Sequence, residues 1–312
     1  LSIQNNNFFI HINGEFLKLN EFEKNRLKKI YKSKSIKPFG YNHEDYVGYV
    51  IYFNKTEFKI QNFDKRNLLL KSKYPNLSKF ILEYEEELRD ILINAKENPN
   101  DIFFPRRGSF IREYGARKKD NLIDLEPYYD KGTKIFFKFI SKENIFGYST
   151  RPYYATSDTY FLWPKFPYED LDILFTLAYL NSKVVRFLFK AKNISIKRSK
   201  TKLEYGLPIP NLNNFKNEKK GPIIELIKTL TSSLVKKSEK ISHKNIENNI
   251  RKIIKSDYYS FIKYKELKEM VISALRENDI NGIQSSIDKL LFQLFDLDEY
   301  LINNLLKKYY NY

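Results

Sequence analysis

The sequence contains no cysteine and very few of the other residues that build reactive or metal-binding sites. Its 312 residues include no Cys, three His, one Met and one Trp. Without Cys, disulfides, thiolate catalysis and thiolate zinc sites are excluded. His11, His43 and His243 stand far apart and follow no metal-ligand spacing. We therefore expect no histidine metal centre.

Long apolar runs and cofactor-binding loops are also missing. No window of about 18 apolar residues exists, so no transmembrane helix is expected, and no signal peptide is visible at the start. The sequence has no G-x-x-x-x-G-K-[ST] phosphate loop. It also lacks a Gly-rich loop for S-adenosylmethionine and an Asn/Asp-Pro-Pro-aromatic motif to hold a flipped base. Because the chain begins with Leu1, we expect it to be part of a longer polypeptide.

One pattern resembles a metal-dependent nuclease site. Glu57-Phe58-Lys59 has the Glu-x-Lys spacing, and Asp45 precedes it on the other side of a β-rich stretch. Two further Glu-x-Lys matches occur, as expected by chance in a Lys-rich chain. Chance is the simpler explanation, and the nuclease stays an alternative to be tested by metal-dependent cleavage.

The charge is strongly positive and concentrated in the middle of the chain. The formal net charge is +17. Residues 1–100 carry 17 basic and 13 acidic side chains, residues 101–220 carry 23 and 13, and residues 221–312 carry 15 and 12. The three net charges are therefore +4, +10 and +3. This pattern predicts a surface for a polyanion, and nucleic acid is favoured over an anionic membrane because no basic helix with a strong apolar face coincides with the cluster.

The hydrophobic pattern predicts an α+β protein: an antiparallel or mixed sheet with packed helices, followed by a C-terminal helical segment. Residues 1–60 show short strands, with an Asn-Gly turn after "FFIHI" and a helix cap at Asn20 with Glu23. A helix is predicted over 76–96 and another over 171–190. Between them, aromatic runs predict an antiparallel sheet, and the chain is helical from Gly221. The predicted divisions are 1–100, an α+β part; 101–215, a recognition core; and 216–312, a helical segment.

Several stretches together resemble the specificity region of TaqI-type adenine-N6 DNA methyltransferases, which also occurs in fused type IIG restriction–modification enzymes. In chain order the stretches are "RLKKIYKSKSIKPFG", "YVIYF", "YPNLSKFILEYEEELRD", "FFPRRG", "KIFFKFISKENIFGYSTRPYYATSDTYFL", "LAYLNSKVVRFLFK", "LEYGLPIP" and "SIDKLLFQLFDLDEYLI". Each is weak alone, and their order and spacing carry the resemblance over nearly the whole chain.

The resemblance implies a DNA target-recognition domain without its catalytic half. In the family, the methyltransferase domain lies N-terminal to this region and binds S-adenosylmethionine. We therefore expect no cofactor in this chain and no catalysis by it alone. The expected partners are double-stranded DNA and an N-terminal methyltransferase domain of the same polypeptide, in the bacterial cytoplasm. The parent would methylate adenine, with DNA cleavage as a further activity in type IIG enzymes. A free-standing specificity subunit of a type I system is the other alternative, although no internal repeat is visible.

Two basic clusters and an aromatic strand supply the candidate DNA contacts. No acidic residue lies between Ile173 and Leu203. Residues 193–206 are expected to form a loop or hairpin. The basic side of the 171–190 helix and the Lys192–Lys202 loop are expected to face phosphates. Arg106 and Arg107 lie between Pro105 and Gly108, and a constrained Arg fork suits guanine. Asn181 and Ser182 are interpreted as structural. The full set of candidates is Arg106, Arg107, Arg112, Arg117, Lys118, Lys119, Lys134, Tyr148, Arg151, Tyr153, Lys197, Arg198, Lys200 and Lys202.

Overall fold

The chain forms two compact units that interleave along the sequence. The computed structural model describes residues 1–5, 7–53, 63–96, 98–103, 133–156, 158–162, 172–194, 197–198, 200–215, 220–239, 269, 273 and 279–310. Unit 1 comprises Leu1–Lys32, Tyr46–Gly132 and Arg151–Ser157, and unit 2 comprises Ser33–Asp45, Thr133–Thr150 and Asp158–Tyr312. Each unit is thus built from separate segments, whereas the divisions expected from the sequence are contiguous.

Unit 1 opens with an antiparallel sheet in the order β1-β2-β3, formed by Ser2–Gln4, Asn7–Ile12 and Glu15–Lys18. Ile12 pairs with Glu15, which leaves a two-residue loop. Asn13 and Gly14 in this loop both have positive φ, at 47° and 86°. This is the geometry that an Asn-Gly hairpin turn requires, so the predicted turn is confirmed.

A short helix after this sheet fixes a second helix through one buried carboxylate. Helix α1, Glu21–Lys24, has the predicted capping box between Asn20 and Glu23. The other carboxylate oxygen of Glu23 accepts the backbone N–H groups of Asn76 and Leu77, at 2.6 and 3.0 Å. These are otherwise unpaired donors at the start of helix α3, so Glu23 joins two helices in the interior.

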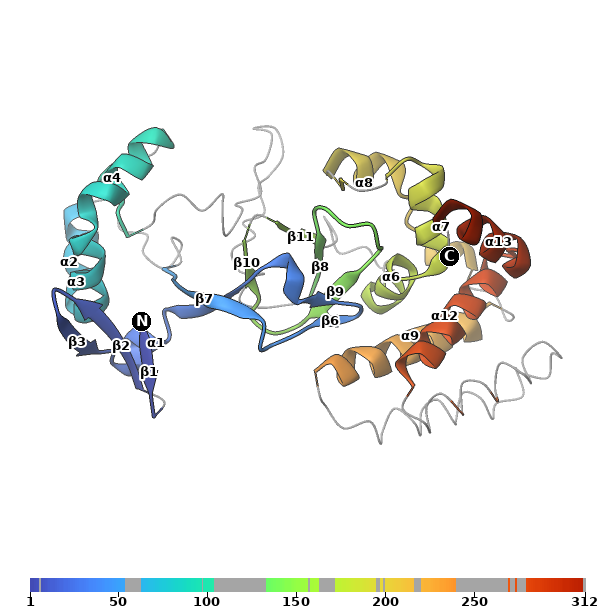
Figure 1. Cartoon of the computed structure of the whole chain (residues 1–312), viewed down its shortest axis with the longest axis horizontal. Coiled ribbons are helices and arrows are strands. Elements are labelled where there is room, and N and C mark those ends of the chain that lie inside the picture. Colours follow the sequence, from blue (N-terminus) through green and yellow to red (C-terminus); the bar gives the residue numbers. More distant parts are fainter. Residues whose placement is uncertain are drawn as a thin grey trace. The chain divides into compact units, whose positions relative to one another are not determined.

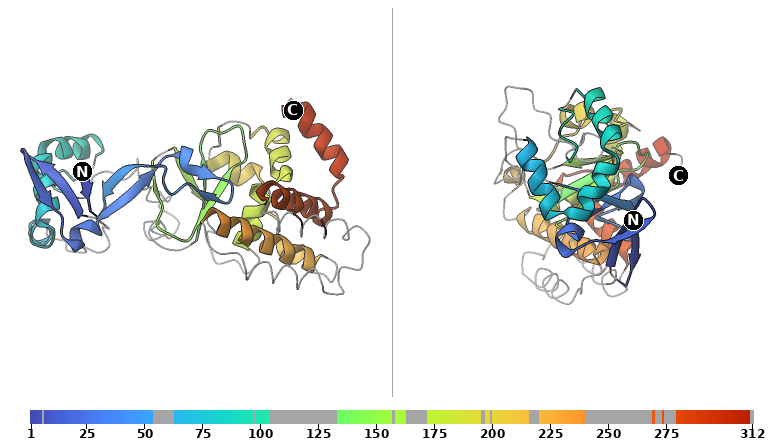
Figure 2. Two further views of the ribbon diagram at one scale, coloured as in Figure 1. Left: turned by 60° about the horizontal axis from the view of Figure 1, so that its bottom comes forward. Right: turned by 90° about the vertical axis from the view of Figure 1, so that its left-hand side faces the viewer.

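Three helices pack beside this sheet: α2, Phe63–Lys73; α3, Pro75–Glu83; and α4, Glu85–Asn94. Helix α3 contacts β2, and Figure 2 shows these helices in cyan beside the dark-blue strands. The predicted single helix over 76–96 is wrong. Tyr84 leaves the helical region with φ −105° and ψ 23°, and Glu85, Glu86 and Glu87 begin a new helix, where acidic groups are favoured by the helix dipole.

A second sheet of unit 1 has the order β10-β4-β7. Strand β4, Leu27–Tyr31, pairs antiparallel with β7, Tyr46–Ile51, and parallel with β10, Tyr154–Ala155. The short strand β10 lies more than 100 residues after β4 and β7 in the sequence. Pairing between such distant segments is not visible in local periodicity.

Unit 2 is centred on an antiparallel sheet in the order β11-β8-β9, formed by Thr159–Leu162, Lys134–Lys138 and Phe146–Ser149. All three strands lie where the aromatic runs predict them. A small hairpin precedes it: 3₁₀ turn η1, Ser33–Ser35, then β5, Ile36–Lys37, and β6, Gly40–Tyr41. A Cβ on Gly147 would overlap the Phe136 ring and the Gly40 carbonyl, so glycine permits the hairpin to approach β9 closely.

The helices of unit 2 cover this sheet and share one large core with it. They are α6, Ile173–Leu180; α7, Lys183–Ala191; α8, Lys200–Gly206; the 3₁₀ turn η3, Leu212–Phe215; α9, Gly221–Ser238; α12, Ile280–Leu294; and α13, Glu299–Tyr310 (Figure 1). Helix α9 packs on α6 and α12, and α13 packs on α7. The α+β class with C-terminal helices is confirmed.

The predicted helix over 171–190 is two helices, because the chain caps itself in the middle. Asn181 ends α6, and the Ser182 hydroxyl caps α7 by accepting the N–H of Val185. Residues 193–206, expected as loop or hairpin, contain helix α8. Pro208 then accepts a hydrogen bond from the Tyr179 hydroxyl, at 2.9 Å. The stiff "LPIP" segment is thereby fixed to α6 before the chain enters its helical tail.

Candidate nucleic-acid interface

The far end of strand β8 carries an exposed lysine beside a pair of stacked aromatic rings. Ile140 and Lys197 form an isolated antiparallel bridge beyond β8, so the loop after α7 extends the edge of the sheet. Lys197 is exposed, with its Nζ 5.6 Å from the centre of the Phe139 ring. Phe139 in turn stacks on Tyr160, with ring centres 4.9 Å apart. This combination of a free cation and aromatic faces is suited to a nucleic-acid backbone.

Arg198, the next residue, has a different role from the predicted phosphate contact. Its side chain is fully buried. The guanidinium donates to the backbone carbonyls of Glu143 and Ser141 and lies 4.7 Å above the Phe189 ring. Burial lowers the pKa of Arg198 to about 10, which still leaves it charged at neutral pH. A buried guanidinium in this position fastens the 141–143 loop and cannot reach a phosphate in this fold.

Three other candidates are interior residues as well. Lys134 in β8 is fully buried, and Tyr148 in β9 is 8% exposed. Burial raises the pKa of the Tyr148 hydroxyl. Tyr153 is fully buried and stacks on Tyr31, with ring centres 5.0 Å apart. Contact with DNA would require these side chains to leave the core, so packing is the role that the fold gives them.

The remaining candidates are either exposed or outside the described residues. Arg151 and Lys202 are exposed, as is Lys197. Lys200 lies in helix α8, but its side chain is not among those described. The first basic cluster lies outside the described residues and consists of Arg106, Arg107, Arg112, Arg117, Lys118 and Lys119.

Asn181 and Ser182 are structural, as predicted from the sequence. The Asn181 amide accepts the N–H of Phe146 and donates to its carbonyl, both at 2.9 Å. One side chain therefore pairs with β9 as a neighbouring strand would. The Asn144 amide donates to the carbonyls of Leu180 and Ser182, at 2.9 and 2.8 Å. The break between α6 and α7 is thus held against the loop that leads into β9.

Part of the basic side of α7 contacts α13. Lys183 donates to the Asn303 side chain at 3.0 Å, and Arg186 lies 4.7 Å above the Tyr310 ring. The Tyr310 hydroxyl donates to the carbonyl of Arg186 at 3.0 Å. The sequence predicts that this side faces phosphates, but the C-terminal helix occupies its first turns. Lys190, one turn further, is exposed.

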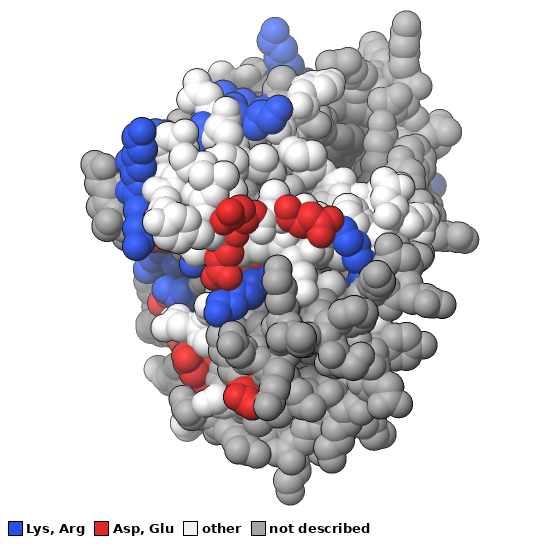
Figure 3. All heavy atoms as spheres, turned by 90° about the vertical axis from the view of Figure 1, so that its right-hand side faces the viewer, with Lys and Arg blue, Asp and Glu red and all other residues white. Residues whose placement is uncertain are grey.

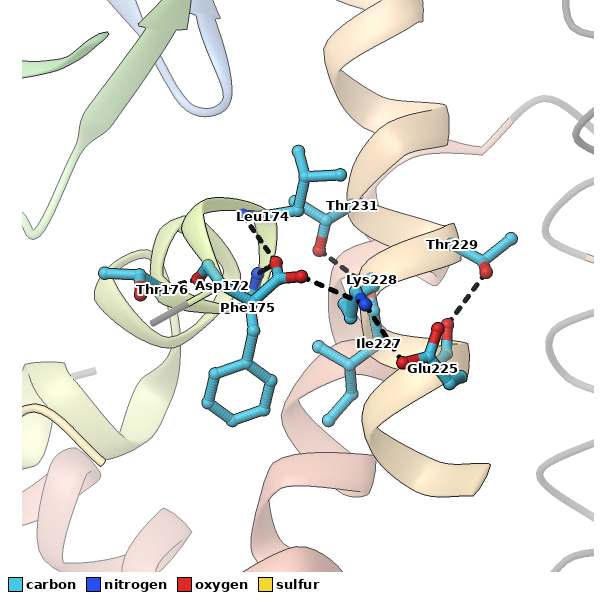
Figure 4. A network of polar contacts seen from close by, with 9 residues as sticks. All are labelled: Asp172, Leu174, Phe175, Thr176, Glu225, Ile227, Lys228, Thr229 and Thr231. Atoms are coloured by element: carbon cyan, nitrogen blue, oxygen red, sulfur yellow. Dashed lines mark hydrogen bonds and ion pairs between the residues drawn. The ribbon is translucent and has the colours of Figure 1, made fainter. Parts of the chain in front are cut away.

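An ion-pair network joins the start of α6 to α9 (Figure 4). One oxygen of Asp172 accepts the N–H groups of Leu174 and Phe175, at 2.9 and 3.0 Å. The other oxygen pairs with Lys228 at 3.0 Å, and Lys228 also pairs with Glu225 at 2.9 Å. Burial opposes the charge on Lys228, but the two carboxylates outweigh it, so the pKa of Lys228 is raised. The network fixes a helix rather than forming a reaction centre.

A second carboxylate, Asp288 of α12, is buried at the start of α7. It is 4% exposed and accepts the backbone N–H of Lys183 at 2.8 Å. Burial raises the pKa of Asp288 to about 6, although the Lys183 N–H and charge act in the opposite direction. Asp288 therefore supplies an acceptor to a helix start and has no exposure to a substrate.

The described residues present exposed cations and no recognisable metal site. Among them, no three His, Cys, Asp or Glu side chains converge as a metal site would require. Glu57 and Lys59, the nuclease alternative, lie outside the described residues. In the described part of the chain, no helix is long and apolar enough to cross a membrane.

Two sets of exposed cations were not selected from the sequence. Lys29 in β4 lies with its Nζ 4.3 Å from the Tyr46 ring centre, and Lys307 and Lys308 are exposed in the last turn of α13. Basic residues beside tyrosines, "KKIY" and "KKYY", are the signal that could have identified both. On the face drawn in Figure 3, Lys and Arg side chains gather toward the upper left, and Asp and Glu side chains stand near the middle.

Two comparisons relate the chain to known proteins. The family model described as the TaqI-like C-terminal specificity domain matches residues 28–208. The match begins in β4 and ends at Pro208, so it includes the sheets of both units from β4 onward and helices α6 to α8. The chain is also 24% identical over 285 residues to the type II methyltransferase M.MjaIV of Methanocaldococcus jannaschii. That alignment covers 91% of this chain and 80% of the relative.

Proposed function

Because the chain belongs to the TaqI-like C-terminal specificity domain family, we propose that it reads a short sequence in double-stranded DNA for an adenine-N6 methyltransferase. The observation that carries the proposal is the family match over 28–208. The relative named as a type II methyltransferase supports the methyltransferase setting. Exposed cations beside aromatic rings, of which Lys197 over Phe139 is the clearest, supply a suitable surface.

We place methyl transfer itself outside this chain. The sequence has neither a Gly-rich loop nor an Asn/Asp-Pro-Pro-aromatic motif, which are the groups that would hold S-adenosylmethionine and a flipped base. In this proposal the cofactor binds to a methyltransferase domain of the parent polypeptide in the cytoplasm. This chain orients the duplex so that the target adenine meets that domain.

Exposed lysines position the duplex in this proposal, and other side chains identify the bases. Lys197 and Lys202 are exposed, so they suit phosphates, which carry no sequence information. Arg106 and Arg107 are our candidates for base contacts, because Pro105 and Gly108 constrain them and an Arg fork matches guanine O6 and N7.

Selection from a pool of randomised duplexes tests the proposal. The unsubstituted chain should enrich one short motif. Arg106→Ala or Arg107→Ala should relax the preference at one position, at a cost of about 1–3 kcal/mol on the selected site alone. Lys202→Ala, the matched control, should weaken selected and random duplexes equally. Failure of the unsubstituted chain to enrich any motif would refute the proposed function.

A titration with S-adenosylmethionine tests the placement of the chemistry. We expect no heat of binding at micromolar concentrations of the chain and cofactor, with or without the selected duplex. Micromolar affinity for the cofactor would show that the catalytic function is not confined to another domain.

A further inference from the structure

The last turns of α7 and α13 meet in unit 2 and bring several cations together. Lys190 of α7 lies with its Nζ 5.8 Å from the Tyr309 ring centre, and Phe187 packs on the same ring at 6.4 Å. One turn earlier, Arg186 lies over Tyr310. Lys192 ends α7 as its cap residue. Helix α13 contributes Lys307 and Lys308 in its own last turn.

The position of Lys307 follows from helical periodicity. Asn303, Lys307 and Tyr310 are spaced i, i+4 and i+7, so they lie along one side of α13. Asn303 and Tyr310 both contact α7. Lys307 therefore lies along the side that contacts α7, and its exposure shows that it stands at the rim of the contact. Tyr309 remains 40% exposed between the lysines.

Helix termini account for only part of this charge. Cations are favoured at helix C-termini, where each macrodipole supplies about −0.5 of an elementary charge. Two such ends offset about one of the four positive charges of the exposed lysines, which are Lys190, Lys192, Lys307 and Lys308. In the described part of the chain, no ion pair joins the four lysines of this group to a carboxylate. About three charges are therefore left facing solvent around an exposed aromatic ring.

From this arrangement we propose that the α7–α13 patch, defined as Lys190, Lys192, Lys307, Lys308 and Tyr309, binds the phosphate backbone of DNA that flanks the recognition site. The proposal rests on the proposed function and extends it, because α13 lies beyond the matched range of 28–208. The lysines neutralise phosphates, and the Tyr309 ring offers a face to a deoxyribose. Such contacts add affinity without adding sequence preference.

The test compares duplexes of increasing length around the selected motif. The unsubstituted chain should bind more tightly as flanking DNA is added. The double variant Lys307→Ala/Lys308→Ala should lose this gain and keep the selected motif. If both lysines contact phosphates, its log–log salt slope should be shallower by about 1.8.

The matched control is Lys71→Ala/Lys73→Ala. It removes the same charge from exposed lysines in the last turn of α2, in unit 1, and should bind every duplex as the parent does. Thermal unfolding of both double variants should match that of the parent, because all four side chains are exposed.

Four results would overturn the inference, and they can be told apart. If the α13 variant keeps the gain from flanking DNA, the patch does not contact DNA and the proposed function is unaffected. If the two double variants lose the same affinity, the effect is one of net charge rather than of this patch. If the variant loses binding to phosphatidylglycerol vesicles and not to DNA, the patch serves a membrane. Failure of the unsubstituted chain to bind any duplex would refute both this inference and the proposed function.

Discussion

At the scale of single residues, neighbours in the sequence have opposite roles. Lys197 is exposed over Phe139, whereas Arg198 is buried among backbone carbonyls. Their charge and their place in a basic run are the same, so composition alone assigns both to phosphate contact. What separates them is the bridge between Ile140 and Lys197, which turns one side chain outward and the next one inward.

We expect this difference to appear in two measurements. Lys197→Ala should leave the free energy of unfolding within about 0.5 kcal/mol, while duplex binding weakens and its salt slope becomes shallower by about 0.9. Arg198→Met keeps much of the volume but leaves the Glu143 and Ser141 carbonyls without a donor, which should cost roughly 1–3 kcal/mol of stability. Denaturant unfolding and duplex titration of both variants check this. Equal loss of DNA affinity at unchanged stability would contradict the buried role.

The structural roles of single residues could be predicted well where a local rule decides them. The Asn13-Gly14 turn and the capping box of Asn20 with Glu23 follow from neighbours within a few positions. The second task of Glu23, at the start of α3, depends on a residue more than 50 positions away. The burial of Lys134 and Tyr148 also depends on partners that no local pattern names.

At the scale of elements, the breaks within helices are the main feature that the sequence failed to predict. Apolar periodicity continues through Tyr84 and through Asn181, so each pair of helices was predicted as one. At Asn181 the chain starts a new helix because Ser182 caps α7. At Tyr84 no side chain caps the next helix, which begins with three glutamates instead. Helix α8 was missed because its sequence, "KTKLEYG", contains only Leu203 and Tyr205 as large apolar residues, too few for a periodic signal.

Asp288 couples two elements and makes their packing sensitive to pH. Its pKa is raised to about 6 in the folded protein, above about 3.9 in an unfolded chain. Between these values Asp288 binds more protons in the folded state than in the unfolded state. Its contribution to stability is therefore fully present below about pH 4 and is lost as pH rises through about 6. About two pKa units correspond to up to about 3 kcal/mol lost by pH 7.

The variant Asp288→Asn should remove this dependence. Its amide oxygen can still accept the Lys183 N–H, and no charge is buried. We expect stability at pH 7 equal to or above that of the parent, and a parent-minus-variant difference that changes between pH 4 and 7. Asp288→Ala is the control, because it leaves the N–H unpaired and should be less stable at every pH. Denaturant unfolding at each pH gives the values. A pH-independent difference between the parent and Asp288→Asn would contradict the raised pKa.

At the scale of the whole molecule, the order of motifs identified the family, but the interleaved units could not be foreseen. Each unit needs segments from both sides of the other: β10 of unit 1 follows β9 of unit 2, and the hairpin of β5 and β6 in unit 2 lies between β4 and β7 of unit 1. Strand pairing across such distances depends on register and on contacts such as Gly147 with Gly40. The order of the segments in the sequence determines neither this register nor these contacts.

The net charge of +17 leads to the last prediction. If exposed lysines such as Lys197, Lys202 and Lys307 bind phosphates, affinity for a duplex should fall linearly in log–log form as salt rises, with a slope of about −0.9 for each contact. The ratio between the selected and a scrambled duplex should change much less, because base-edge contacts release no counterions. Titrations of both duplexes from 50 to 200 mM salt measure this. A flat salt dependence would mean that the excess of lysine reflects composition alone, and the recognition surface would then have to be sought among uncharged side chains.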